Sequence, residues 1–221
     1  MRCSECSRRV RPIVAIDLDG TLGDYHGHLQ RFAEEYWGVD LAGNVYAGDQ
    51  AHRDYYASLG FPFREFREMK LAYRQGGQKR TMPIFAGAAE LVNYLRAAGA
   101  EVWLTTTRPY LRLDGVDPDT REWLRRNGIE YDGLLYDEDK YRVLAERVDP
   151  ERVVAVLDDL PEQILVAAEA FGPMIPIWKR GVSNDLSDPV SLLGQKVSAV
   201  RDLADARTMI ASRIAVWEAA R

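Results

Sequence analysis

The chain has 221 residues, of which 47% are hydrophobic, and its formal net charge is −5. This length fits one domain, or one domain with a sizeable insertion, and the apolar content is sufficient for a buried core. The acidic balance argues against a general polyanion-binding surface, although it leaves room for a local basic pocket. No apolar run reaches the length of a membrane span, and no apolar signal-peptide core follows the first residue. We therefore expect a soluble, cytoplasmic protein.

The two cysteines, Cys3 and Cys6, have the spacing of half a zinc knuckle, but the sequence contains no second pair. The three histidines lack the usual ligand spacing from each other: His26, His28 and His52. The alternatives for residues 1–11 are a zinc site shared between two chains, a redox pair, or a mobile tail with no role in chemistry. A homodimer is one alternative for the oligomeric state.

An apolar run over residues 13–16 ends in two carboxylates on alternate residues, Asp17 and Asp19, and Gly20 follows at once. A short apolar run that ends at a turn residue is typical of a buried strand. Side chains two residues apart on an extended segment point the same way, so both carboxylates can converge on one site just beyond this strand. Because a buried unpaired charge is costly, we expect a metal ion and a phosphate group to bind there.

Residues 24–82 are rich in aromatic side chains and contain no strand-like apolar run. Apolar residues spaced three and four apart predict helices over residues 29–37 and 63–73. We expect a mostly helical insertion in which these aromatic side chains mainly form the core. Its basic residues form either a solvated face or a surface that attracts a nucleotide phosphate or a nucleic-acid end: Arg64, Arg67, Lys70, Arg74, Lys79 and Arg80.

From residue 83 onward, strand-like and helix-like segments alternate. After a first strand over residues 12–17, the expected strands cover 101–105, 131–136, 152–157 and 174–178. The expected helices cover 87–98, 117–127, 139–147, 161–170 and 200–219. This alternation predicts an α/β fold with a parallel sheet that is covered by helices on both faces.

Ligands bind such sheets beyond the carboxyl ends of the strands, and four of the predicted strand ends carry polar side chains. These side chains are Asp17 and Asp19 after the first strand, Thr105, Thr106, Thr107 and Arg108 after the second, Lys140 after the third, and Asp158 and Asp159 after the fourth. One such ending is ordinary. Four of them at one edge of a sheet indicate a shared site.

The order of these endings resembles the phosphatases of the haloacid dehalogenase (HAD) superfamily. Their pattern is Asp-x-Asp-Gly-Thr, then Thr or Ser after a strand, then Lys, then paired acids. Here the matching residues are 17–21, Thr106 with Thr105 as the fallback, Lys140, and Asp158 with Asp159. The resemblance covers about residues 12–180. It implies a Rossmann-like HAD fold, with a core of residues 12–23 and 83–221 and a small helical cap over residues 24–82.

Two groups within this superfamily share further features with the chain. The 5'(3')-deoxyribonucleotidase group is similar through Asp24-Tyr25, residues 83–88 and Asp139-Lys140, although it has Thr-Ser-Pro where this chain has Thr-Thr-Arg-Pro. Residues 106–109 and 127–129 are similar to the phosphatase half of polynucleotide kinase-phosphatases. The sequence contains no Walker-type Gly-Lys-Thr/Ser loop, so we expect no kinase half.

The resemblance implies a phosphomonoesterase, a hydrolase that works through an aspartyl-phosphate intermediate with Mg²⁺ as its cofactor. Asp17 would be the nucleophile and Asp19 the general acid and base, and a neighbouring carboxylate would favour the protonated Asp19 that the first step needs. Thr106 and Lys140 would bind the phosphoryl group that is transferred. The Mg²⁺ ligands would be Asp17, Asp158 or Asp159, and the backbone carbonyl of Asp19.

The substrate would contact Tyr25, Thr107 and Arg108, with the Tyr25 ring stacked on a base. We expect a (deoxy)nucleoside monophosphate. The alternatives are the 3'-phosphate end of DNA or RNA, a transferase of the phosphoglucomutase type, and a non-catalytic domain that keeps the fold for binding.

Each of these residues also has a purely structural interpretation. Two acids after a strand can cap a helix, Thr106 can serve a turn, and Lys140 can be a solvated lysine. Asp158 and Asp159 can form a helix N-cap before Pro161, and Arg108 can pair with a nearby acid.

Overall fold

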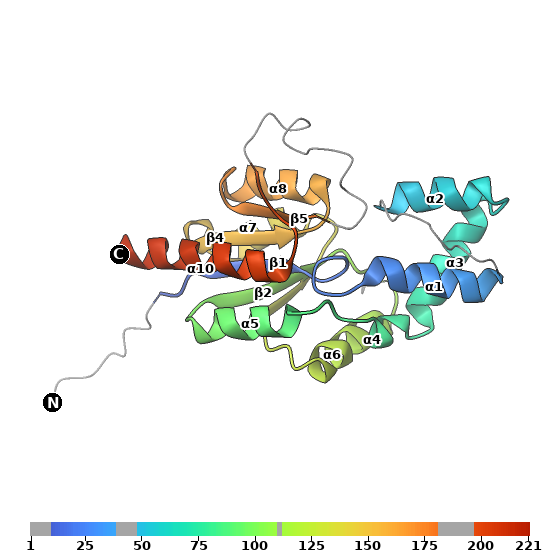
Figure 1. The fold of residues 1–221 in the computed structure, drawn as a ribbon, viewed down its shortest axis with the longest axis horizontal. Helices are drawn as coiled ribbons and strands as arrows, with labels where there is room; N and C mark the ends of the chain where they lie inside the picture. Colours follow the sequence, from blue (N-terminus) through green and yellow to red (C-terminus); the bar gives the residue numbers. More distant parts are fainter. Residues whose placement is uncertain (1–9, 39–47, 110–111, 181–196) are drawn as a thin grey trace.

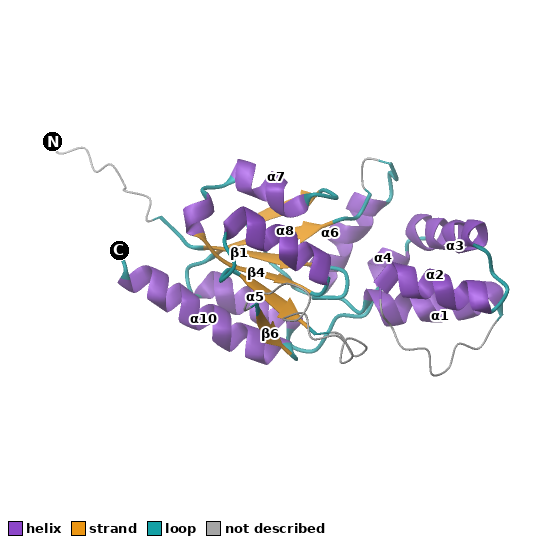
Figure 2. Cartoon of the chain, turned by 90° about the horizontal axis from the view of Figure 1, so that it is seen from above, coloured by secondary structure: helices purple, strands orange, loops and turns teal. Residues whose placement is uncertain are grey.

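The computed structural model describes residues 10–38, 48–109, 112–180 and 197–221. The chain forms a six-stranded parallel sheet with helices on both faces, and a group of further helices lies beyond one end of the sheet (Figures 1 and 2). The α/β fold expected from the alternating pattern is therefore confirmed. Cys3 and Cys6 lie outside the described residues, so the zinc, redox and tail alternatives stay predictions.

The sheet has the strand order β3-β2-β1-β4-β5-β6. Its strands are β1 (Ile13–Asp17), β2 (Glu101–Thr106), β3 (Gly133–Tyr136), β4 (Val153–Asp158), β5 (Pro176–Lys179) and β6 (Ser198–Val200). β1 lies in the middle, and Asp17 pairs in register with Thr105 of β2. The first five strands match the predicted ones, whereas β6 was not predicted because three residues are too few to form a periodic pattern.

Four helices separate β1 from the remainder of the core: α1 (Tyr25–Trp37), α2 (Gly48–Ser58), α3 (Phe63–Gln75) and α4 (Gln78–Thr81). The other helices are α5 (Ala88–Ala97), α6 (Val116–Arg126), α7 (Lys140–Arg147), α8 (Pro161–Phe171) and α10 (Leu203–Ala219). α5 and α10 cover one face of the sheet, and α7 and α8 cover the other (Figure 1). No helix of the described ranges is long and apolar enough to cross a membrane.

β1 is buried on both faces, which explains its continuous apolar run. Val14 and Ile16 belong to the core cluster shared with α5 and α10, whereas Ile13 and Ala15 belong to the cluster shared with α7 and α8. Because side chains alternate along a strand, Asp17 continues the set of Ile13 and Ala15. Its carboxylate therefore reaches the edge of the sheet on the side where α7 begins.

The helices between β1 and β2 pack through aromatic contacts, as expected. Tyr56, Phe66 and Tyr73 are fully buried, and the rings of Tyr56 and Phe66 lie 5.4 Å apart. Tyr36 and Phe63 differ from the expectation, because half of each side chain is exposed. The aromatic content of this segment therefore exceeds what its small core buries.

α4 connects these helices to the core through α6. Arg80 donates to Asp119 of α6, with Nη2 2.6 Å from Oδ1, and the Trp123 indole donates to the Met82 carbonyl at 2.6 Å. Asp119 and Trp123 are both buried. These contacts fix the position of Lys79, which lies next to Arg80 on the same short helix.

Candidate active site

The chain turns sharply directly after β1, over residues 18–23. The amides of Leu22 and Gly23 both donate to the Leu18 carbonyl, at 3.1 and 2.9 Å. Gly20 has a φ of +96°, and a Cβ at this position would lie 2.1 Å from Asp159 Oδ2. Both the backbone conformation and the space therefore require glycine at this position. The turn leaves the carboxylates of Asp17 and Asp19 at the carboxyl edge of the sheet.

Asp17, Asp158 and Asp159 form a buried trio whose carboxylate oxygens lie within 4.8 Å of one another. They come from the ends of the neighbouring strands β1 and β4. Burial and the charges of the other two acids raise the pKa of Asp17 well above its usual value, and burial and Asp158 raise the pKa of Asp159 to about 7. The Asp17 Oδ2 atom is buried and has no hydrogen-bond partner among the described residues.

This donor set fits an oxygen-liganded divalent cation. Hard cations such as Mg²⁺ bind carboxylate oxygens, and a cation here would remove the repulsion that raises these pKa values. The Asp19 carboxylate is not part of the trio within the described part of the chain. The sequence prediction that Asp17, Asp158 and Asp159 come together is therefore matched by the geometry, and their role as metal ligands is a proposal.

Lys140, the first residue of α7, lies against this trio. Its Nζ is 2.5 Å from Asp17 Oδ1 and 2.7 Å from Asp158 Oδ2, and its side chain is 1% exposed. Burial opposes the charged form, but the carboxylates of Asp158 and Asp17 outweigh it and raise the pKa of Lys140. The Tyr141 hydroxyl also donates to Asp158 Oδ2, at 2.5 Å. Lys140 is thus a fixed positive charge beside Asp17 and does not form part of a solvated helix face.

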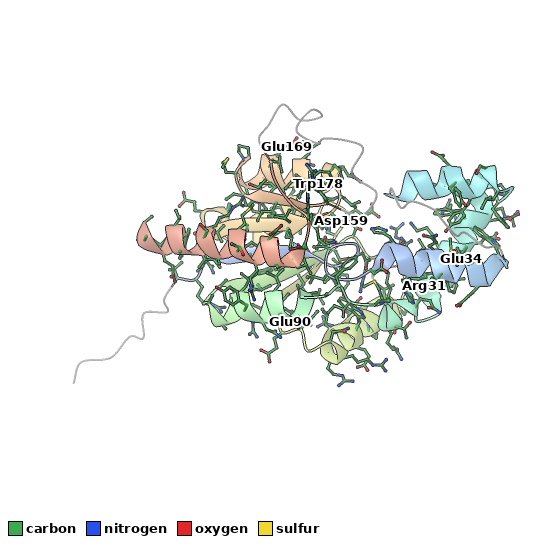
Figure 3. All side chains as sticks on the ribbon, viewed as in Figure 1. Arg31, Glu34, Glu90, Asp159, Glu169 and Trp178 are labelled. Carbon is green, nitrogen blue, oxygen red and sulfur yellow. The ribbon has the colours of Figure 1, made fainter. Side chains whose placement is uncertain are left out.

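Asp159 is held by groups from three directions. The Thr21 hydroxyl donates to its Oδ1 at 3.1 Å, and His26 Nε2 of α1 lies 3.2 Å from its Oδ2. The Trp178 indole of β5 donates to its backbone carbonyl at 2.9 Å. Figure 3 shows Asp159 between the sheet and α1, and Trp178 beside it. These contacts orient the carboxylate toward the end of β1.

Asp19 lies in a different environment from the one expected. Arg108 donates to its carboxylate from Nε at 3.0 Å and from Nη2 at 2.5 Å, and Lys79 Nζ donates to Oδ2 at 2.5 Å. Although burial opposes the charged form, Arg108 and Lys79 hold the pKa of Asp19 well below its usual range. The expectation that a neighbouring carboxylate favours protonated Asp19 is therefore wrong for this arrangement, because two cations are the nearest charges.

A pocket of about 150 Å³ opens at this point. The side chains that line it include Asp17, Asp19, Tyr25, His26, Arg74, Lys79, Thr107 and Arg108. The three predicted substrate contacts are all among them. Thr106 is buried and does not belong to the described lining, and its hydroxyl oxygen accepts the Arg108 amide at 3.3 Å.

The Tyr25 ring differs from the expected stacking platform. It is 6% exposed, and Lys79 Nζ lies 3.7 Å from its centroid. Lys79 thus covers one face of the ring, and a base has no access to that face in this arrangement. His26, Arg74 and Lys79 were not assigned to the site from the sequence. Lys79 and Arg74 were visible only as members of a basic segment, and His26 only as a histidine two residues from another.

The topology, with acids at the carboxyl ends of β1 and β4 and a helical insertion directly after β1, is the Rossmann-like fold of HAD hydrolases. No family model matches the sequence, and the search of curated proteins found no match. Among solved structures, the chain is similar to a HAD family hydrolase from Deinococcus radiodurans R1 that was solved with bound phosphate and sodium. The TM-score is 0.61 at 21% identity, over 92% of this chain and 96% of that one.

Two further structures show the same fold. The HAD-hydrolase YfnB of Bacillus subtilis, bound to magnesium, has a TM-score of 0.62 at 13% identity, over 90% of this chain and 98% of that one. The D,D-heptose 1,7-bisphosphate phosphatase of Burkholderia thailandensis has a TM-score of 0.53 at 12% identity, over 91% and 99%. These likenesses show the fold. The likeness to nucleotidases or to polynucleotide kinase-phosphatases stays a prediction.

Proposed function

We propose that this protein is a Mg²⁺-dependent phosphomonoesterase that works through an aspartyl-phosphate intermediate. The observation that carries the proposal is Asp17. One of its oxygens is bound by Lys140, while the other is buried without a hydrogen-bond partner among the described residues and lies in the acidic trio. A buried carboxylate in this state is suited to attack phosphorus once a cation and a phosphate are present. The phosphate and metal ions in the similar structures support the same interpretation.

In the first step, Asp17 forms a bond to phosphorus, and the bond from phosphorus to the ester oxygen breaks. The leaving oxygen takes a proton from Asp19. In the second step, Asp19 takes a proton from water, whose oxygen bonds to phosphorus and releases Asp17 and inorganic phosphate. Mg²⁺, held by Asp17 with Asp158 or Asp159 and by the Asp19 carbonyl, would neutralise the phosphate charge and relieve its repulsion by the acids.

The first step needs a proton on Asp19, whereas Arg108 and Lys79 hold this residue ionised. We propose that the substrate phosphate competes for both cations, because a dianionic phosphate offers them more charge than one carboxylate. Asp19 would then lose its partners and gain a proton in the presence of substrate. Arg108 and Lys79 thus have a role in substrate binding, together with Thr107, while Lys140 and Thr106 stabilise the phosphoryl group.

The helices α1 to α4 would form the cap, and the substrate that we propose is a (deoxy)nucleoside monophosphate. Support comes from the position of Tyr25, which lines the pocket on the first turn of α1. Because Lys79 covers one face of its ring, a base would use the other face or displace the lysine as the phosphate draws it away.

The test is phosphate release from an aryl phosphate with and without Mg²⁺. Asp17→Asn should lose this release, whereas Asp114→Asn, which changes an exposed acid outside the site, should keep it. Undiminished release by Asp17→Asn contradicts the mechanism. Absence of release by the wild type would favour the non-catalytic alternative, and phosphoryl transfer to an acceptor sugar in place of water would favour the transferase. A panel of nucleoside monophosphates then tests the substrate.

A further inference from the structure

A groove of about 720 Å³ runs between α3 and the segment that follows β2. We call it the α3 groove. Two acidic side chains, Glu68 and Glu138, line it, against six cationic ones: Arg53, Arg64, Arg67, Lys70, Arg74 and Arg112. The groove is therefore strongly basic, although the whole chain has a net charge of −5.

Both acids of the α3 groove already have cationic partners. Arg64 Nε lies 3.0 Å from Glu68, and Arg112 Nη2 lies 2.6 Å from Glu138. Four cationic side chains therefore remain in excess. One of them carries a buried nitrogen, Arg53 Nε, that has no hydrogen-bond partner among the described residues. Buried polar groups normally have partners, so this nitrogen indicates that an acceptor is missing.

The α3 groove and the catalytic pocket are continuous. Arg74 and Pro109 line both of them. The pocket of about 150 Å³ is smaller than typical small-molecule sites, which hold about 300–1,000 Å³. It therefore has room for a phosphoryl group and little more, so the remainder of a substrate must extend into the adjoining space. The α3 groove is the space that begins at the same two residues.

The α3 groove combines spaced cations with an aromatic surface. Arg67, Lys70 and Arg74 follow one another at three and four residues, so they form one face of α3 over about 10 Å of the helix axis. Phe63 at the start of α3 is 50% exposed, and the guanidinium groups of Arg53 and Arg67 lie 5.1 and 5.8 Å from its ring. Proteins that bind single-stranded nucleic acids use this combination, because cations follow the phosphates and aromatic or guanidinium planes stack on bases.

We propose that the α3 groove binds the phosphodiester backbone of a single-stranded nucleic acid whose terminal phosphate enters the catalytic pocket. This inference rests on the proposed function for the fate of the terminal phosphate. It extends that function, because a nucleoside monophosphate is then the smallest form of a substrate whose full form is a strand end. An acidic peptide would match the cations but would leave the Phe63 surface without a planar partner.

Binding is tested without turnover in the Asp17→Asn background, by fluorescence anisotropy of a labelled ten-nucleotide strand with a terminal phosphate at either end. Arg67→Glu should weaken binding at least tenfold. It should also lower the steepness of log Kd against log salt by about 0.7 or more, since each phosphate contact to a single strand contributes about that slope. Arg67→Gln, a milder change, should shift both in the same direction. Arg207→Glu changes an exposed arginine on α10, at the far end of the molecule, and should leave both unchanged (Figure 1).

Equal binding by Arg67→Glu and Arg207→Glu overturns the proposal, as does equally effective competition by an acidic peptide of the same charge. The activity experiment separates this proposal from the proposed function. If the wild type releases no phosphate from an aryl phosphate, the proposed function fails, while the anisotropy result still decides on the α3 groove. If it does release phosphate, Arg67→Glu should keep the aryl phosphate activity and lose the advantage in kcat/KM of the strand over the mononucleotide.

Discussion

Lys79 Nζ lies 2.5 Å from Asp19 Oδ2, although the two residues are sixty positions apart in the sequence. Lys79 belongs to α4, which the Arg80–Asp119 pair ties to α6, and its own side chain is 3% exposed. The helical insertion thus supplies a buried cation to the carboxyl end of β1. Together with Arg108, this cation decides the charge of the residue that we propose as the general acid and base.

We predict that Lys79→Met lowers kcat/KM for an aryl phosphate about 10²-fold, the usual effect of removing one transition-state donor. Asp19 keeps Arg108 as a partner, so folding should survive the substitution. Lys79→Arg keeps the positive charge and should lose much less activity. Steady-state kinetics of the three proteins check this prediction, and full activity of Lys79→Met would show that the lysine is only a structural partner of Asp19.

Lys140→Met should destabilise the metal-free protein by about 3–5 kcal/mol, because it leaves Asp17 and Asp158 buried without their cation. A divalent cation at the trio would replace part of the lost positive charge. Mg²⁺ should therefore raise the unfolding free energy of this variant more than that of the wild type. Urea unfolding of both proteins, in EDTA and in Mg²⁺, measures the difference. An equal response to Mg²⁺ in both proteins would be evidence against a cation site next to Lys140.

Gly20→Ala tests the close approach between the first turn and Asp159. Its Cβ would lie 2.1 Å from Asp159 Oδ2, whereas a Cβ at Gly99, which has a similar φ of +90°, would meet nothing within 4 Å. Gly99→Ala should therefore show only backbone strain, on the order of 1–3 kcal/mol. Gly20→Ala should be less stable than this control and should lose Mg²⁺-dependent phosphate release. Equal stability and activity of the two variants would mean that the turn adjusts without disturbing Asp159.

His28 predicts a dependence of folding stability on pH. Its Nδ1 lies 2.9 Å from the Tyr73 hydroxyl, and burial together with the charges of Arg31 and Lys79 lowers its pKa from 6.5, against the opposite effect of two acids, Asp24 and Glu35. The unfolded chain therefore takes up this proton at a higher pH than the folded chain does. This contribution to stability is complete above about pH 6.5 and is lost as the pH falls below it.

The measurement is the unfolding free energy between pH 5 and pH 8 for the wild type and His28→Asn. The variant lacks the titrating group, so its stability should fall less on acidification, while the carboxylates contribute equally to both proteins. Identical pH profiles would show that His28 takes up its proton in the folded protein as readily as in the unfolded chain.

The sequence was most informative where local patterns decide the structure. The apolar run before Asp17 predicted a buried strand because a strand covered on both faces is apolar throughout, and the alternation after residue 83 predicted the parallel sheet. Parallel strands end at a common edge, so the convergence of Asp17, Lys140 and Asp158 followed from their places at strand ends.

The remainder of the site depends on contacts that no local pattern encodes. The charge state of Asp19 is determined by Arg108 and by Lys79, and the latter reaches it only because the short helix α4 packs on α6. The Tyr25 ring was predicted to be open to a base, but the same lysine covers it. β6 and α4 contain too few residues for a periodic pattern, so they could not be predicted.

The central claim is that Asp17 becomes covalently phosphorylated. An acid quench during turnover of an aryl phosphate with Mg²⁺, followed by mass spectrometry of the peptide that contains residues 13–22, tests it most directly. Our account predicts a phosphoryl group on Asp17 in the wild type, and neither this adduct nor phosphate release in Asp17→Asn. Release of phosphate at the wild-type rate by Asp17→Asn, with no adduct on this peptide in either protein, would contradict it.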